Sequence, residues 1–301
     1  MPSIGKPGIA GVPAANRSPL HTETPAPQVS PESPRTTPLA LRDWTDELVQ
    51  PDQRARARIR QAYTITDPTP DAIKGKNERS EMNAIGGHTA PGKILDMGGD
   101  ASKGTTLTVH GKDDNPASVL PLGERAERAG TGRATFAYDD LSRRLDDNTN
   151  DLANGIRALL AKHPGAPLTV NAFSTGARMA AVALGRLEKA GALEGRDVRL
   201  NLVAPVLRGS VSSNAAAVVT WLDRRLQCEV DMGSLSNYQS ELASTRLRTV
   251  KAQVYGGADD QVAPVGDAWK QLARDLTGRE PIVLPGVTHE AAIAAAAALL
   301  P

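Results

Sequence analysis

The sequence predicts an α/β fold in which a mainly parallel sheet carries helices on both faces. The main observation is that short β-rich runs alternate with longer helical runs after Gly104. The β-rich runs are residues 105–110, 133–138, 168–172, 198–204, 249–255 and 281–284. Among the helical runs, residues 145–162 keep their large apolar side chains on one face, at spacings of about three and four residues. No internal repeat is found, so a solenoid or a propeller is not expected.

The chain divides into three parts by composition. Residues 1–40 are rich in Pro, Ser and Thr and hold too few apolar residues to form a core, which predicts a disordered tail. Residues 41–100 form a poorly legible extension: they begin with a helix-compatible stretch broken at Pro51, and packing of this part on the core is left open. Residues 101–301 are expected to form the folded domain.

Charge and hydropathy exclude several classes of protein. Lys and Arg number 35 and Asp and Glu 34, so a net charge of +1 gives no electrostatic case for a nucleic-acid partner. No apolar run approaches the roughly 20 residues of a membrane helix, and the alanine-rich residues 291–300 are interpreted as a docked helix. The N-terminus lacks a conventional signal peptide, so we expect a soluble protein that is cytoplasmic or exported by a non-classical, effector-type route. The single cysteine, Cys228, excludes an internal disulfide and a Cys-rich metal site and is expected to be a small buried residue.

A candidate nucleophile stands at the joint of a β-rich run and a helical run. Ser174 lies in NAFSTGARM, after the apolar residues 167–170 and before the helical run that starts at residue 180. The positions two before and two after it are Ala172 and Gly176, and a sharp strand-to-helix turn that exposes a serine needs small residues there. Such small residues are also common in ordinary turns. The motif alone therefore leaves open whether Ser174 is a nucleophile or a small turn residue.

An aspartate and a histidine follow later β-rich runs. Residues 255–264 (YGGADDQVAP) offer Asp260, with Asp259 as the alternative, either to orient an imidazole or to cap the next helix. His289 follows the last run, where a lone histidine is more often structural than catalytic. The order Ser174, Asp260, His289, each after a successive run, favours a catalytic triad over three separate turn residues.

With these residues, the region from about residue 105 to the C-terminus resembles the α/β-hydrolase superfamily, and within it small serine lipases and esterases. The first β-rich run ends in His110-Gly111, as the family's first long strand does. Residues 202–210 (LVAPVLRGS) and 231–244 (DMGSLSNYQSELAS) are similar to lipase segments between the nucleophile and the acid. The resemblance implies the α/β-hydrolase fold, often with antiparallel strands before the first parallel one.

The resemblance also implies roles for backbone groups around the nucleophile. It assigns the oxyanion hole to the backbone N–H groups of Lys112 and Thr175, and it makes Gly111, Ala172 and Gly176 the residues that support the loop and the turn.

Three positions depart from the family's common pattern. Ala172 stands where most members have Gly, Phe173 where many lipases have His, and Ala177 where a second Gly is usual. None of these changes removes a catalytic group. The family's acid lies four residues before a proline, which fits Asp260 and Pro264.

The resulting expectation is a serine hydrolase that cleaves small-molecule or lipid carboxylic esters through an acyl-enzyme, without a metal or an organic cofactor. One alternative is a non-catalytic binding or effector protein on the same fold. Another is a hydrolase or acyltransferase that acts on thioesters or peptides. Oligomeric state and natural substrate are not assigned.

The longest insertion of the expected domain is residues 207–244. Its helix-like stretch carries Val218, Val219, Trp221 and Leu222. These side chains are expected either to cover an acyl pocket or to pack as a surface helix on the sheet.

Overall fold

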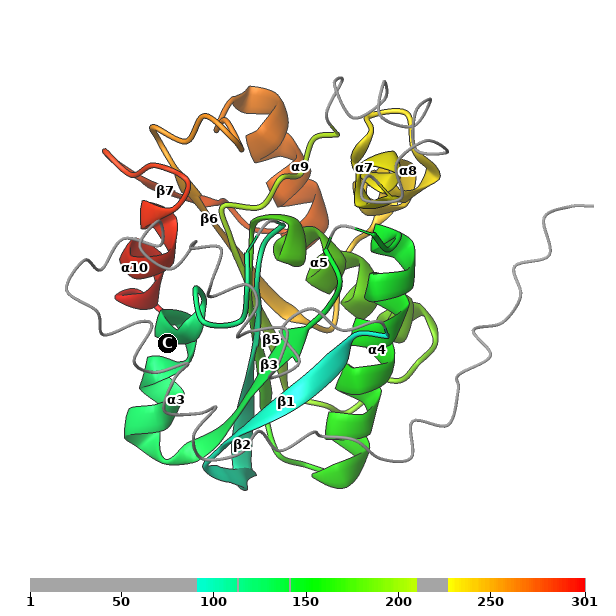
Figure 1. Ribbon diagram of the computed structural model, residues 1–301, viewed down its shortest axis with the longest axis vertical. Helices are drawn as coiled ribbons and strands as arrows, with labels where there is room; N and C mark the ends of the chain where they lie inside the picture. The colour runs from blue at the N-terminus through cyan, green and yellow to red at the C-terminus, as the bar shows by residue number, and fades with distance from the viewer. Residues whose placement is uncertain (1–90, 113, 141, 210–226, 301) are drawn as a thin grey trace, which may run out of the picture. The chain divides into compact units, whose positions relative to one another are not determined.

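Seven strands form one sheet in the part of the chain that the structure, a computed structural model, describes: residues 91–112, 114–140, 142–209 and 227–300 (Figure 1). The strand order across the sheet is β1-β3-β2-β4-β5-β6-β7. All neighbours are parallel except β1, which pairs with β3 in antiparallel fashion. The strands are β1 (Lys93–Gly98), β2 (Asp100–Val109), β3 (Thr131–Ala137), β4 (Leu168–Phe173), β5 (Val198–Val203), β6 (Lys251–Gly257) and β7 (Ile282–Leu284).

The predicted fold class is confirmed, because the sheet is mainly parallel and helices lie on both of its faces (Figure 1). Each of the six β-rich runs coincides with one of the strands β2 to β7. Strand β1 was not located from the sequence, although the resemblance implies antiparallel strands before the first parallel one. It lies inside residues 41–100, and its KILDMG sequence shows no strict alternation of buried and exposed side chains. The domain boundaries at residues 40 and 100 stay predictions.

The helices contribute to two hydrophobic layers. They are η2 (Leu120–Gly123), α3 (Glu124–Ala129), α4 (Leu145–Lys162), α5 (Ser174–Lys189), α7 (Gln227–Met232), α8 (Asn237–Ser244), α9 (Asp267–Thr277) and α10 (Ala291–Ala297). Apolar side chains of α4, α5, α8 and α9 fill one layer, and those of η2 and α10 fill the other (Figure 1). The predicted docked helix at residues 291–300 is α10, which buries Ala292, Ile293 and Ala296. Among the described residues, no helix has the length and apolar composition needed to cross a bilayer.

Helix α5 is the central helix of the larger layer, and it is buried almost all round. Its residues from Ser174 to Gly185 are all buried, and most of them are small. Small side chains let the helix approach its neighbours closely: a Cβ on Gly185 would lie 2.6 Å from Cγ2 of Thr245. The helix that begins at Ser174 is therefore held rigidly by the core beneath it.

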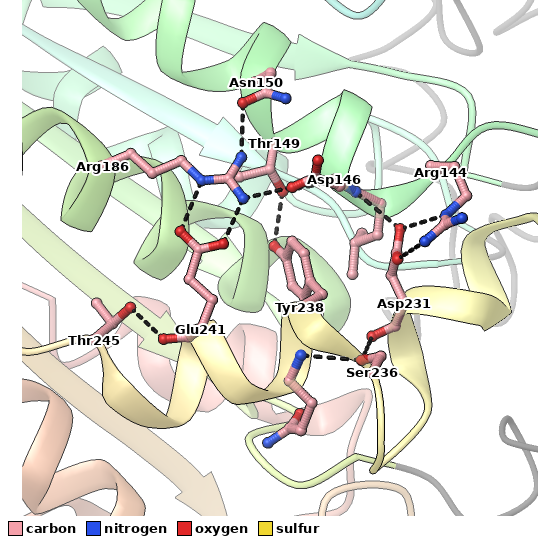
Figure 2. A network of polar contacts seen from close by, with 12 residues as sticks. Arg144, Asp146, Thr149, Asn150, Arg186, Asp231, Ser236, Tyr238, Glu241 and Thr245 are labelled. Carbon is pink, nitrogen blue, oxygen red and sulfur yellow. Dashed lines mark hydrogen bonds and ion pairs between the residues drawn. The ribbon is translucent and has the colours of Figure 1, made fainter. Parts of the chain in front are cut away.

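Polar side chains fasten α8 to α4 and α5 (Figure 2). The Arg186 guanidinium donates two hydrogen bonds to the carboxylate of Glu241, at 2.9 and 2.6 Å. It also binds Asp146 and donates to Asn150 on α4. Because a guanidinium matches a carboxylate in geometry, this arrangement fixes the relative position of three helices.

Helix α7 is fastened at its own end by Asp231. This carboxylate forms an ion pair with Arg144 and accepts the backbone N–H of Asp146 at 3.1 Å, at the start of α4 (Figure 2). The backbone carbonyl of Asp231 accepts the Ser236 hydroxyl, which in turn accepts the N–H of Gln239 and caps α8. The described part of the predicted insertion is thus a fixed pair of short helices.

The two ends of the insertion meet in the described structure. Gln239 donates to the Leu207 carbonyl at 2.9 Å, and a Cβ on Gly209 would lie 2.2 Å from Cα of Ser234. The four side chains that were expected to cover an acyl pocket or to pack as a surface helix lie outside the described residues: Val218, Val219, Trp221 and Leu222.

Candidate active site

Ser174 lies at the turn between β4 and α5, at the carboxyl end of the central strand. Its φ is +52°, in the left-handed region that residues other than glycine rarely adopt. The preceding residue, Phe173, is still extended, so the chain passes from strand to helix within one residue. This backbone is the strained strand-to-helix turn that the A-x-S-x-G pattern predicts.

The small residues around Ser174 have a measurable steric reason. A Cβ on Gly176 would lie 2.1 Å from the carbonyl oxygen of His110, so only glycine fits where α5 passes the end of β2. Ala172 is fully buried and pairs with Val109 across the sheet.

The structure brings Ser174, His289 and Asp260 together in one hydrogen-bonded line. Oγ of Ser174 lies 2.8 Å from Nε2 of His289, and Nδ1 of His289 lies 2.7 Å from Oδ2 of Asp260. All three residues are buried, with 7%, 6% and 4% of their surface exposed for serine, histidine and aspartate. A carboxylate only accepts, so His289 carries its proton on Nδ1 and its Nε2 is free to accept the serine proton.

Asp260 is held by hydrogen bonds at both carboxylate oxygens. Its Oδ1 accepts the backbone N–H groups of Val262 and Ala263 at 2.8 and 2.7 Å. Burial raises the pKa of this carboxyl, but the hydrogen bond from His289 and those from the two N–H groups outweigh it and leave the pKa below its ordinary value. Asp260 therefore stays ionised at neutral pH.

The lowered pKa also links this site to stability. A carboxyl with a folded pKa below the unfolded value, about 4, stabilises the fold above that pH, and the contribution is lost as the pH falls through the folded pKa.

The alternative acid, Asp259, is exposed, and its backbone N–H donates to the Val287 carbonyl at 3.1 Å.

The loop after β2 lies directly against the serine. A Cβ on Gly111 would lie 3.1 Å from Cβ of Ser174 and 3.2 Å from the Phe173 ring. Lys112 follows, and its side chain forms an ion pair with Glu229 on α7. The loop that begins with His110 and Gly111 thus lies beside the turn that contains Ser174.

Thr175 occupies the first turn of α5, where backbone N–H groups have no partner within the helix. The N-terminus of a helix favours negative charge. The Thr175 hydroxyl donates a weak hydrogen bond to the sulfur of Met232 at 3.9 Å, so the end of α7 covers this side of the turn.

An aromatic ring covers the histidine. The ring centroids of Phe173 and His289 are 4.9 Å apart and tilted by 45°. Phe173 belongs to the smaller apolar layer, together with Ala204 and Tyr255 at the ends of the next two strands. The substitution of Phe for His in the common lipase pattern therefore gives the imidazole an apolar neighbour.

The single cysteine lies in the core. Cys228 is fully buried, and burial raises the pKa of its thiol well above the ordinary value, so it is an inert core residue, as expected. Within the ranges that the structure describes, no three His, Cys, Asp or Glu side chains are grouped as metal ligands. The cluster can transfer a proton from a serine hydroxyl to an imidazole that is oriented by a carboxylate.

No family model matches the chain, and no curated protein matches it either. Solved structures do match. One, from the pair of metagenome-derived lipolytic enzymes LipS and LipT, is 17% identical with a TM-score of 0.51, over 69% of this chain and 91% of the other. The monoacylglycerol lipase of Paleococcus ferrophilus is 12% identical with a TM-score of 0.52, over 66% of this chain and 90% of the lipase.

The chain has the α/β-hydrolase fold. The α/β-hydrolase fold that the resemblance implies is therefore confirmed. At these identities the likeness extends to the arrangement of strands and helices and not to individual side chains.

One contact of the site was not predicted from the sequence. The hydroxyl of Tyr138, at the end of β3, donates to the carbonyl oxygens of His110 and Gly111 at 2.9 and 3.2 Å. The only available signal was the position of a tyrosine directly after a β-rich run, at the edge of the sheet where the loop of His110 also begins.

The contact between Gly176 and the His110 carbonyl gives a test of the turn. We expect Gly176→Ala to lower the free energy of unfolding by about 3 kcal/mol, because the new methyl group overlaps a backbone oxygen that cannot move alone. The matched control is Gly266→Ala, where a Cβ would meet no atom within 4 Å, and a change below about 1 kcal/mol is expected. Urea unfolding measures both, and equal losses would contradict the close approach.

Proposed function

We propose that the protein is a serine hydrolase that cleaves carboxylic esters, in the manner of lipases and esterases, through an acyl-enzyme. Ser174 is the nucleophile, His289 the general base and acid, and Asp260 the residue that orients the imidazole. The observation that carries the proposal is the hydrogen-bonded line from Ser174 through His289 to Asp260, which starts at a strained turn. The α/β-hydrolase fold shared with two lipolytic enzymes supports the coarser statement that the protein is a hydrolase.

In the first half-reaction, Ser174 Oγ attacks the ester carbonyl carbon while His289 Nε2 takes the hydroxyl proton. A tetrahedral intermediate forms and its oxygen becomes an anion. The imidazolium is stabilised by Asp260, which remains ionised because its pKa is lowered. His289 then gives the proton to the leaving alkoxide as the ester C–O bond breaks, and the acyl group stays on the serine.

The oxyanion is stabilised in this proposal by the backbone N–H groups of Lys112 and Thr175. Two observations support the assignment. Gly111, which precedes Lys112, lies against Cβ of Ser174, and Thr175 is in the first turn of a helix. N–H groups fixed by the fold need no reorganisation when the charge develops, which makes such donors effective in acyl transfer.

In the second half-reaction, water attacks the acyl-enzyme carbonyl and gives its proton to His289. The serine leaves as the acid forms, and His289 returns the proton to Ser174 Oγ. Each step uses protein groups and water, so we propose no metal and no organic cofactor. The substrate is a small-molecule or lipid ester.

Hydrolysis of p-nitrophenyl esters of increasing acyl length tests this function. We expect turnover by the wild type and a loss of roughly 10⁴- to 10⁶-fold in kcat for Ser174→Ala, because the nucleophile is removed. Ser240→Ala on α8 removes an exposed serine hydroxyl and serves as the control, with activity unchanged. A folded wild type without turnover at any chain length would contradict the proposal.

The identity of the acid is tested separately. Asp260→Asn is expected to lower kcat/KM by roughly 10³- to 10⁴-fold, because an amide favours the wrong histidine tautomer. The neighbouring Asp259→Asn changes an exposed carboxylate and is expected to keep activity within about twofold. Steady-state kinetics on one ester compares them. Equal losses in the two variants would refute the assignment of Asp260.

A further inference from the structure

The peptide that joins Gly111 to Lys112 is held at its carbonyl end by two donors. The hydroxyl of Tyr138 donates to the Gly111 carbonyl oxygen at 3.2 Å, and Nδ1 of His110 donates to the same oxygen at 2.8 Å. The same hydroxyl shares its single proton with the His110 carbonyl oxygen, at 2.9 Å. Two consecutive carbonyl groups of the loop therefore face Tyr138.

The orientation of this carbonyl determines the orientation of one N–H group. A trans peptide is planar, and its C=O and N–H bonds point in opposite directions. Because the Gly111 carbonyl faces Tyr138, the N–H of Lys112 points away from Tyr138. Gly111 itself lies against Ser174, where a Cβ would be 3.1 Å from that of the serine.

We infer that Tyr138 is a positioning residue for the oxyanion hole: its hydroxyl, together with Nδ1 of His110, fixes the Gly111–Lys112 peptide so that the Lys112 N–H is directed at the substrate oxygen. The inference rests on the proposed function. Tyr138 does not touch the substrate in this account. It acts through the peptide that does, in the way that an outer residue orients a catalytic group.

The surroundings of Tyr138 make it a rigid anchor. Its side chain is fully buried. Its ring stacks on those of His110 and Phe136, with 4.2 and 5.4 Å between the ring centroids. Burial, together with the nearby carboxylates of Asp140 and Asp114, raises the pKa of the phenol. The hydroxyl is therefore a proton donor throughout the pH range in which the triad works.

A second restraint acts on the same loop from the other direction. The Lys112 side chain is paired with Glu229 on α7, and α7 is fastened to α4 through Asp231. Loss of the Tyr138 hydroxyl would leave the Gly111 carbonyl held by Nδ1 of His110 alone, and would therefore misdirect the Lys112 N–H in part without releasing the whole loop. Complete loss of an oxyanion donor costs roughly 10²- to 10³-fold in kcat, so a misdirected donor is expected to cost about tenfold.

The test compares two buried tyrosines. Tyr138→Phe removes the hydroxyl and keeps both ring contacts. The matched control is Tyr238→Phe, since Tyr238 is also buried and its hydroxyl hydrogen-bonds with that of Thr149 on α4, at 2.7 Å (Figure 2). For each variant, kcat per active site, KM, and the affinity for a trifluoromethyl ketone are measured. Active sites are titrated with a fluorophosphonate, so that a lower yield of folded protein does not change kcat.

We expect Tyr138→Phe to lower kcat and the affinity for the ketone by the same factor, about tenfold, with KM unchanged. Tyr238→Phe should leave all three quantities within about twofold. An active wild type with an unaffected Tyr138→Phe, or equal losses of kcat in both variants, would overturn this inference and leave the proposed function intact. A wild type without turnover and without labelling would overturn the proposed function, and this inference with it.

Discussion

The backbone at Ser174 has a φ of +52°, and the strand before it and the helix after it are needed to hold this conformation. A residue other than glycine in the left-handed region costs about 1–3 kcal/mol and persists only where the fold over-determines it. Here the fold does so from both sides. Strand β4 pairs with β2 as far as Ala172 and with β5 as far as Phe173. Helix α5 is buried along its first three turns. The strain is offset by packing that has little to do with the serine itself.

The turn also determines which other groups can reach the serine. Gly176 brings the start of α5 against the His110 carbonyl, and so places the loop of Gly111 beside Ser174. The carboxyl ends of parallel strands meet at one edge of the sheet, so Asp260 after β6 and His289 after β7 reach the same point. Three hydrogen bonds and one ring contact hold the buried Asp260 and His289 in one arrangement.

Much of this could be predicted from the sequence, and the reasons differ from one element to another. Strands β2 to β7 were visible because each is a short β-rich run between helical runs, and helix α4 kept the bounds that its apolar spacing predicted. Strand β1 was missed because its six residues mix buried and partly buried positions next to two glycines. The residues of the site were named from two signals in the sequence: the order of the serine, the aspartate and the histidine after successive β-rich runs, and the small residues beside Ser174.

Contacts that depend on three-dimensional proximity could not be predicted in this way. Tyr138 and the two carbonyl groups that it binds are 28 and 27 residues apart in the chain. A tyrosine that follows a strand carries no sequence signal that specifies its hydrogen-bond partner. The pairing of Lys112 with Glu229 joins residues 117 positions apart in the chain and could not be predicted either. The expected pocket side chains at residues 218–222 stay a prediction.

The central claim is that a covalent intermediate forms on Ser174. The most direct measurement is to react the full chain with a fluorophosphonate, digest it, and locate the adduct by tandem mass spectrometry. The account predicts one adduct, on the peptide that contains Ser174, and no adduct after prior unfolding, because the isolated serine is not activated. A folded protein that takes up no adduct, or carries it on another residue, would contradict the account.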